Sequence, residues 1–128
     1  MKTLHYVLIV CGLLLVAACT GKPLYNVESA PLNAPETASL DDIQRGIIRA
    51  GAMRGWQMTP IEPGYVQGTL NRRSHTAVID VRFDEDSYSI LYKDSTNLNY
   101  DGESIHGAYN QWIQYLQTDI NAQMAALY

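Results

Sequence analysis

The sequence is poor in cysteine, with only Cys11 and Cys19 among its 128 residues. It also lacks the short motifs of common catalytic and metal sites: paired cysteines at zinc spacing, His-Glu-x-x-His, a phosphate-binding glycine loop, Gly-x-Ser-x-Gly and Ser-x-x-Lys. His75 and His106 have no third ligand in view, so they are a weak metal hypothesis. These absences predict a protein that is not an enzyme and that binds no metal and no dissociable cofactor.

Long basic runs are absent as well. The longest is Arg72-Arg73, and 9 lysine and arginine residues stand against 13 aspartate and glutamate residues. Because nucleic acid binding depends on clustered positive charge, we expect no nucleic acid partner. The length allows one small domain, and a hydrophobic share of 47% is that of a folded chain.

The apolar run at residues 7–16 is too short to cross a bilayer, which takes roughly 20 apolar residues. It follows Lys2 and has the length of the hydrophobic region of a secretory signal peptide. The run ends in VAAC at residues 16–19, which resembles the lipobox, the recognition sequence of the bacterial lipoprotein family. The N-terminus therefore predicts export from the cytoplasm.

The resemblance implies that residues 1–18 are a cleaved signal peptide and that Cys19 carries diacylglycerol on its sulfur and an acyl chain on its amine. These covalent lipids attach the protein to a membrane. Thr20 replaces the aspartate that favours inner-membrane retention in such lipoproteins, which indicates the periplasmic face of the outer membrane and leaves the inner membrane open. A signal peptide without lipidation and a short uncleaved anchor stay open as alternatives.

The segment at residues 20–38 contains Pro23, Pro31 and Pro35 and no apolar period. Proline fixes its own backbone angle and disfavours a helical predecessor, so the segment is predicted to be an extended tether. The lipidated cysteine and this tether would occupy residues 19–38, and a small α+β globular domain would follow over residues 39–128.

The domain is predicted to begin with a helix over residues 40–54. Ser39 is its expected N-cap with Asp42 three residues on, and Gly55 is its expected stop. A change to period two then predicts an antiparallel meander joined at residues 71–75 and 84–86. Its strands are expected over Tyr65–Leu70, Thr76–Phe83 and Ser87–Lys93, with a fourth, edge strand over Trp56–Ile61.

From Ile105, apolar residues recur at spacings of three and four as far as Leu127, which predicts a C-terminal amphipathic helix. This helix needs an apolar partner, and the inner face of the meander is the one available. The expected fold is therefore α+β: an N-terminal helix, a three- to four-stranded antiparallel meander, and a C-terminal helix packed on one sheet face.

The stretch SILYKDSTNLNYDGESIHGAYNQWIQYLQTDI, residues 89–120, resembles a family of small uncharacterised proteobacterial lipoproteins. A tyrosine-rich strand leads there through a Ser/Asn-Leu-x-Tyr-Asp-Gly loop into an Ile-His-x-x-Tyr-Asn-x-Trp helix. The resemblance implies the same fold and the same membrane location. It implies no enzymatic activity and no functional residues.

The same loop is the candidate binding surface, because it gathers amides, a carboxylate, an imidazole and phenols. Its residues are Asn97, Asn99, Tyr100, Asp101, His106, Tyr109 and Asn110. A structural interpretation competes with this one: asparagine and Asp-Gly favour turns, Ser104 can cap the helix, and Tyr109 can belong to the core.

These patterns favour a non-enzymatic lipid-anchored periplasmic module that binds another envelope protein. Two alternatives stay open. One is a small-molecule or glycan-binding module that uses the region Tyr92–Asn110, and the other is an enzyme of an unrecognised kind.

Overall fold

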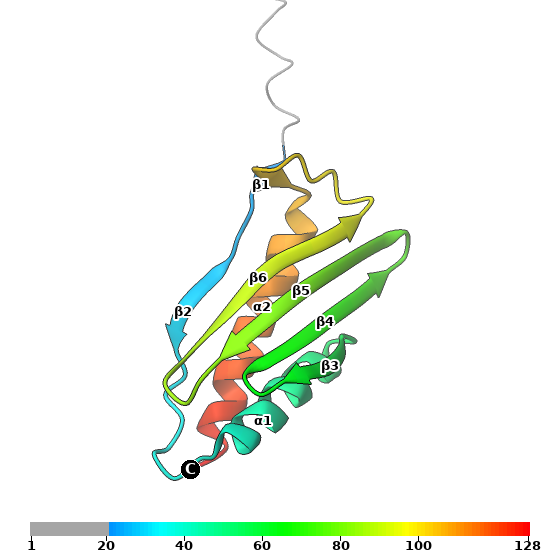
Figure 1. Cartoon of the computed structure of the whole chain (residues 1–128). Coiled ribbons are helices and arrows are strands. Elements are labelled where there is room, and N and C mark those ends of the chain that lie inside the picture. Colours follow the sequence, from blue (N-terminus) through cyan, green and yellow to red (C-terminus); the bar gives the residue numbers. More distant parts are fainter. Residues whose placement is uncertain (1–20) are drawn as a thin grey trace, which may run out of the picture.

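The computed structural model describes residues 21–128, so the predicted signal peptide and the lipid-attachment residue Cys19 lie outside the described residues. Within that range the fold is α+β, with a five-stranded antiparallel sheet and two helices that both cover one face of it (Figure 1). A separate two-stranded ribbon lies at one end of the molecule, and the C-terminus lies at the other end. In this part of the chain no helix combines the length and the apolar character that crossing a membrane requires.

The large sheet has the strand order β2-β6-β5-β4-β3, and the ribbon pairs β1 with β7. The predicted meander is confirmed, as is the edge position of β3, but the sheet has five strands and not three or four. In chain order the elements are β1 (Lys22–Pro23), β2 (Val27–Pro31), α1 (Leu40–Met53), β3 (Gln57–Glu62), β4 (Tyr65–Arg72), β5 (His75–Phe83), β6 (Ser87–Thr96), β7 (Ser104–Ile105) and α2 (Gly107–Ala125).

The segment before α1 is the main correction to the expected fold. The prediction of a tether is wrong for residues 21–38, because β1 pairs with β7, β2 pairs with β6, and the side chains of Val27 and Leu32 are only 4% and 1% exposed. Proline is tolerated on edge strands, where one row of backbone N–H groups needs no partner. The first helix is consequently the third element of the fold and not its N-terminal one.

The predicted start of α1 is confirmed in atomic detail. The Ser39 hydroxyl accepts a hydrogen bond from the backbone N–H of Asp42 at 3.1 Å, and the Asp42 carboxylate accepts one from the backbone N–H of Ser39 at 3.0 Å. This capping box lowers the pKa of Asp42, chiefly through the bond from the Ser39 backbone. The helix ends one residue earlier than expected, and Gly55 follows with a φ of 91°.

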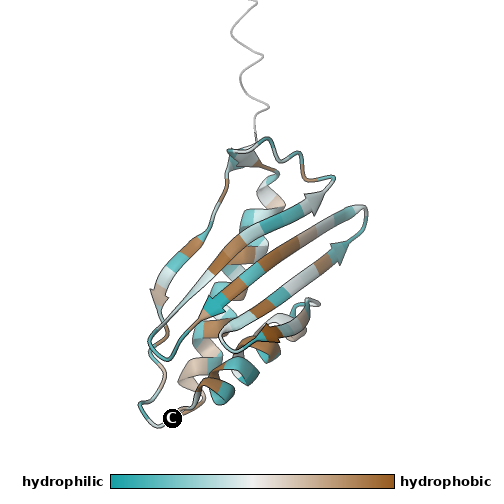
Figure 2. Ribbon diagram, viewed as in Figure 1, coloured by the Kyte–Doolittle hydropathy of each residue, from teal (hydrophilic) through white to brown (hydrophobic). Residues whose placement is uncertain are grey.

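The core lies between the sheet and the helices. Side chains alternate along β5, where Ala77, Ile79 and Val81 are fully buried toward the helices, and Figure 2 shows this alternation as bands along the strand. From α2, the residues Ile113, Leu116, Ile120 and Met124 complete the layer. The expected packing of the C-terminal helix on one sheet face is therefore confirmed.

The start of α2 differs from the prediction by two residues. Ile105 belongs to β7, and the N-cap is His106 and not Ser104: the Nδ1 atom of His106 accepts a hydrogen bond from the backbone N–H of Ala108 at 3.1 Å. The chain is held extended up to this point because the His106 N–H donates to the carbonyl oxygen of Leu98 at 2.8 Å. Helical periodicity cannot detect such a tertiary restraint.

We expect Leu32→Ala to lower the free energy of unfolding by about 2–5 kcal/mol, because it removes a buried side chain and leaves a cavity. Chemical denaturation of the variant measures this loss. Glu36→Ala, an exposed change in the same segment, is the control and should have almost no effect. A stability unchanged by Leu32→Ala would mean that the segment is a free tether after all.

Candidate functional site

The loop between β6 and β7 uses several predicted site residues to shape its own backbone. Asn97 and Asn99 have φ angles of 59° and 53°, a left-handed conformation that asparagine tolerates better than most residues. The Asp101 carboxylate accepts hydrogen bonds from the backbone N–H groups of Ser104 at 2.7 Å and Glu103 at 2.9 Å, which lower its pKa. These side chains build a turn.

Two further predicted residues fasten separate segments together. The side-chain amide of Asn110 accepts from the backbone N–H of Tyr25 at 2.9 Å and donates to the carbonyl oxygen of Pro23 at 2.8 Å. The amide of Asn97 donates to the carbonyl oxygen of Ser74, at the tip of the β4–β5 hairpin, at 2.8 Å. Both amides are thus engaged inside the molecule, where they bond backbone groups at the ends of strands and in turns.

Tyr109 lies in the core and contacts Tyr92, which in turn packs on Tyr100. The ring centroid of Tyr92 is 5.7 Å from that of Tyr109 and 4.2 Å from that of Tyr100, and of the three only Tyr100 is exposed, at 37%. Burial raises the pKa of the Tyr109 phenol well above its usual range. Its hydroxyl has no hydrogen-bond partner within residues 21–128.

The two histidines do approach each other, with ring centroids 5.5 Å apart, and the indole of Trp112 lies 6.4 Å from His75. Nδ1 of His75 lies 2.7 Å from the carbonyl oxygen of Asn97, so this nitrogen is the donor. No group of three or more His, Cys, Asp or Glu side chains able to hold a metal ion occurs in the described part of the chain. The pair is a contact between β5 and the start of α2.

The seven predicted residues therefore lie at one end of the molecule but in different roles. Asn97, Asp101 and Asn110 are occupied by intramolecular hydrogen bonds, and Tyr109 is buried. Tyr100 and His106 are exposed but also bond the backbone of Gly102 and Ala108, and Asn99 is exposed.

A cavity of about 180 Å³ next to this region has the composition of a binding site. It lies where the C-terminal end of α1, the start of β3, the end of β4 and the first half of α2 meet. We name it the aromatic–arginine pocket, and its lining residues are Arg54, Trp56, Leu70, Arg72, Trp112 and Tyr115.

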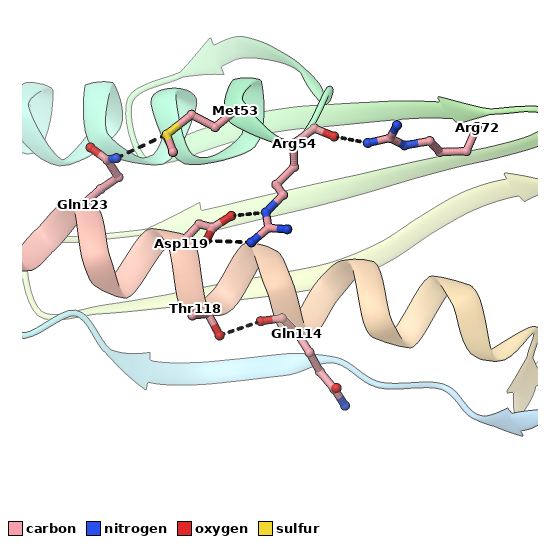
Figure 3. Close-up of polar contacts among 7 residues, drawn as sticks. All are labelled: Met53, Arg54, Arg72, Gln114, Thr118, Asp119 and Gln123. Atoms are coloured by element: carbon pink, nitrogen blue, oxygen red, sulfur yellow. Dashed lines mark hydrogen bonds and ion pairs between the residues drawn. The ribbon is translucent and has the colours of Figure 1, made fainter.

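The two arginines of the pocket differ in their partners (Figure 3). The guanidinium of Arg54 bonds both carboxylate oxygens of Asp119, with N–O distances of 2.6 and 3.4 Å, and lies 4.8 Å from the centroid of the Tyr115 ring. Arg72 donates from Nη2 to the carbonyl oxygen of Arg54 at 2.6 Å. No described carboxylate lies within 4.0 Å of Arg72, so its charge is not neutralised within residues 21–128.

The end of α1 positions Trp56 in the pocket wall. After Arg54 the chain reverses through Gly55, and the backbone N–H of Trp56 donates back to the carbonyl oxygen of Gly51 at 3.0 Å. The Trp56 side chain is 3% exposed and belongs to the core, whereas Trp112 is half-buried and Tyr115 is exposed. The pocket thus has a rigid floor and an accessible rim.

A larger hollow, of about 420 Å³, lies between the start of α1 and the β3–β4 turn. Its lining residues are Leu40, Asp41, Gln44, Pro60, Ile61, Glu62 and Pro63. It contains neither an aromatic ring nor a cation, and its two acidic side chains are exposed. We favour the smaller pocket because tryptophan, tyrosine and arginine are the residues that carry most binding energy at protein interfaces.

Comparison with family models, with curated proteins and with solved structures found no match to this chain. Function is therefore inferred from the N-terminal sequence and from the geometry of the described residues.

We expect Tyr109→Phe to leave the free energy of unfolding unchanged or to raise it by about 1 kcal/mol, because a buried unpaired hydroxyl is costly. Tyr88→Phe is the matched control: Tyr88 is equally buried, but its hydroxyl donates to Oδ1 of Asn121 at 2.8 Å, so its removal should cost about 1 kcal/mol. Denaturant titration of both variants checks this. Equal losses would mean that the Tyr109 hydroxyl has a partner.

Proposed function

We propose that this chain is a non-enzymatic, lipid-anchored module of the bacterial envelope that binds another envelope protein through the aromatic–arginine pocket. The address rests on the signal-like run at residues 7–16 and on the lipobox-like ending at Cys19. Acyl chains on that cysteine would hold the domain at the periplasmic face of the outer membrane. Retention at the inner membrane is the alternative address.

The single observation that carries the binding role is Arg72, whose guanidinium has no carboxylate partner among the described residues and which lines the same pocket as Trp112 and Tyr115. A guanidinium in an aromatic setting recognises a carboxylate well, because its planar fork donates two parallel hydrogen bonds. The partner's contact segment would therefore present a carboxylate next to an apolar side chain.

The size of the pocket favours a partner's side chain over a free small molecule. Sites for drug-sized ligands enclose about 300–1,000 Å³, whereas this pocket encloses about 180 Å³. A cavity of that volume accepts one side chain of an interface and leaves the rest of the contact to the surrounding surface. Exposed Tyr115, which lines the pocket, can contribute to that surface.

A catalytic role is less well supported because of the groups that line the pocket. Its titratable side chains are Arg54, Arg72 and Tyr115, and arginine does not release a proton in proteins, so it cannot act as a general base. The alternative of a small-molecule or glycan site over Tyr92–Asn110 stays a prediction. The hydrogen bonds made by Asn97, Asp101 and Asn110 give it little support.

We expect affinity capture with the intact acylated protein to recover a specific envelope protein. Arg72→Gln should weaken its binding roughly tenfold or more, as expected for an arginine at the centre of an interface. Arg73→Gln is the matched control, because Arg73 is the neighbouring exposed arginine and does not line the pocket. Circular dichroism of both variants verifies the fold.

Two other results would contradict the proposal at different points. Equal recovery with Arg72→Gln and Arg73→Gln would exclude the pocket, and recovery of bulk envelope proteins alone would contradict a binding role. Mass spectrometry tests the anchor separately, since a mature chain with an unmodified Cys19 thiol would exclude lipid attachment.

A further inference from the structure

The packed domain begins almost directly after the lipid-attachment residue. Thr20 alone lies between Cys19 and Gly21, so two α-carbon steps join them, and two extended residues span at most about 7 Å. Gly21 is already packed, because a β-carbon built on it would lie 2.7 Å from the carbonyl oxygen of Ile105. Lys22 then pairs with Ile105 in the β1–β7 ribbon.

The polar layer of a bilayer leaflet is about as thick as this connection is long. A bilayer measures about 40–45 Å with its headgroups and about 30 Å without them, which leaves roughly 5–7 Å for each headgroup layer. Acyl chains on Cys19 must reach the hydrocarbon, so the residues that follow have no length left to cross an aqueous gap.

We infer that the β1–β7 ribbon and the loop of residues 97–103 form a membrane-facing end that rests on the headgroup layer of the bilayer holding the chain's own lipid. This inference rests on the proposed lipid anchor. The ribbon and the loop lie together at the end of the molecule where the described chain begins (Figure 1). A surface that resembled a ligand site in sequence is thereby assigned to the membrane.

The side chains at this end suit a headgroup layer. Tyr100 is 37% exposed, its ring packs on that of Tyr92, and its hydroxyl donates to the carbonyl oxygen of Gly102 at 3.3 Å. An amphipathic aromatic ring is the side chain most enriched at the level of lipid headgroups. Exposed Asn99 adds hydrogen-bonding capacity beside it.

Charge does not drive the contact. The exposed charged residues of the ribbon and the loop are Lys22, Asp101 and Glu103, one positive against two negative, so these two segments supply no net attraction to anionic lipid. The short covalent connection brings this end to the bilayer, and rising salt should leave the arrangement unchanged.

The membrane-facing end is also firmly joined to the rest of the domain. The backbone N–H of Leu24 donates to the carbonyl oxygen of Glu103 at 2.9 Å. The side chain of Asn110 in α2 bonds the backbone of the residues before and after Leu24, which are Pro23 and Tyr25. The ribbon therefore cannot peel away to lengthen the connection without loss of these bonds. The domain is held by one defined end.

Depth-dependent fluorescence quenching tests the inference on the acylated protein in vesicles of phosphatidylethanolamine and phosphatidylglycerol. A single thiol-reactive dye is placed by Glu103→Cys or by Ala125→Cys. Both positions are exposed, and they lie at opposite ends of α2, whose 19 residues span about 28 Å. Cys19 does not compete for the dye, because its sulfur is alkylated in the lipidated chain.

A quencher attached to lipid headgroups should quench the dye at position 103 severalfold more strongly than the dye at position 125. A second protein carries ten glycine and serine residues inserted after Thr20, which add a mean reach of about 18 Å. This insertion should abolish the difference while the protein still sediments with the vesicles.

Three results would overturn the inference. Equal quenching at the two positions in a protein that still sediments would contradict the membrane-facing end. The proposed lipid anchor would not be affected. A difference that persists after the insertion would mean that the short connection is not its cause. A protein that does not sediment at all would overturn the proposed anchor and, with it, the orientation that depends on it.

Discussion

One side-chain amide holds the beginning of the fold in place. Asn110, in the first turn of α2, accepts a hydrogen bond from the backbone of Tyr25 and donates one to the backbone of Pro23. These bonds satisfy one backbone group at the end of β1 and one in the connection between β1 and β2. They hold residues 21–38 against the domain, where Val27 and Leu32 are buried. Without these bonds residues 21–38 would be held less firmly against the domain. The segment would then act as a long linker between the lipid and the domain.

This restraint also fixes the distance between the membrane-facing end and the aromatic–arginine pocket. Trp112 and Tyr115 are five and eight residues beyond the start of α2, which corresponds to about 8 and 12 Å along the helix axis. If the β1–β7 end rests on the bilayer, the distance from the aromatic–arginine pocket to the lipid headgroups is roughly one to two helix diameters. A partner that reaches it must itself be attached to the membrane or extend down to its surface. The two proposals together therefore narrow the partner to proteins with an acidic, partly apolar segment near the bilayer.

The elements that sequence predicted well are those encoded by neighbours along the chain. The capping box of α1 needs only Ser39 and Asp42, and the alternation in β5 is visible within nine residues. The start of the fold was missed because its partners are distant: Val27 pairs with Ile90, and Lys22 pairs with Ile105. Prolines in that segment suggested a tether, although an edge strand tolerates them equally. The pocket was missed for the same reason, since its lining residues come from β4, from α2 and from the connection between α1 and β3, and none of these carries a local motif.

The loop of residues 97–103 shows why composition alone is a weak guide to a binding site. Amides and carboxylates bind ligands well for the same reason that they stabilise turns: each offers donors or acceptors to backbone groups that lack partners. The side chains of this loop already bond backbone groups of Glu103 in the loop, of Ser104 next to it and of Ser74 in the β4–β5 hairpin. Arg72 and Tyr115 lie in regular elements whose own backbone needs no side chain to complete its hydrogen bonding, although Arg72 gives one donor to the carbonyl oxygen of Arg54. A side chain on such an element keeps more of its bonding capacity for a partner, which is why the pocket, and not the polar loop, is the better candidate for recognition.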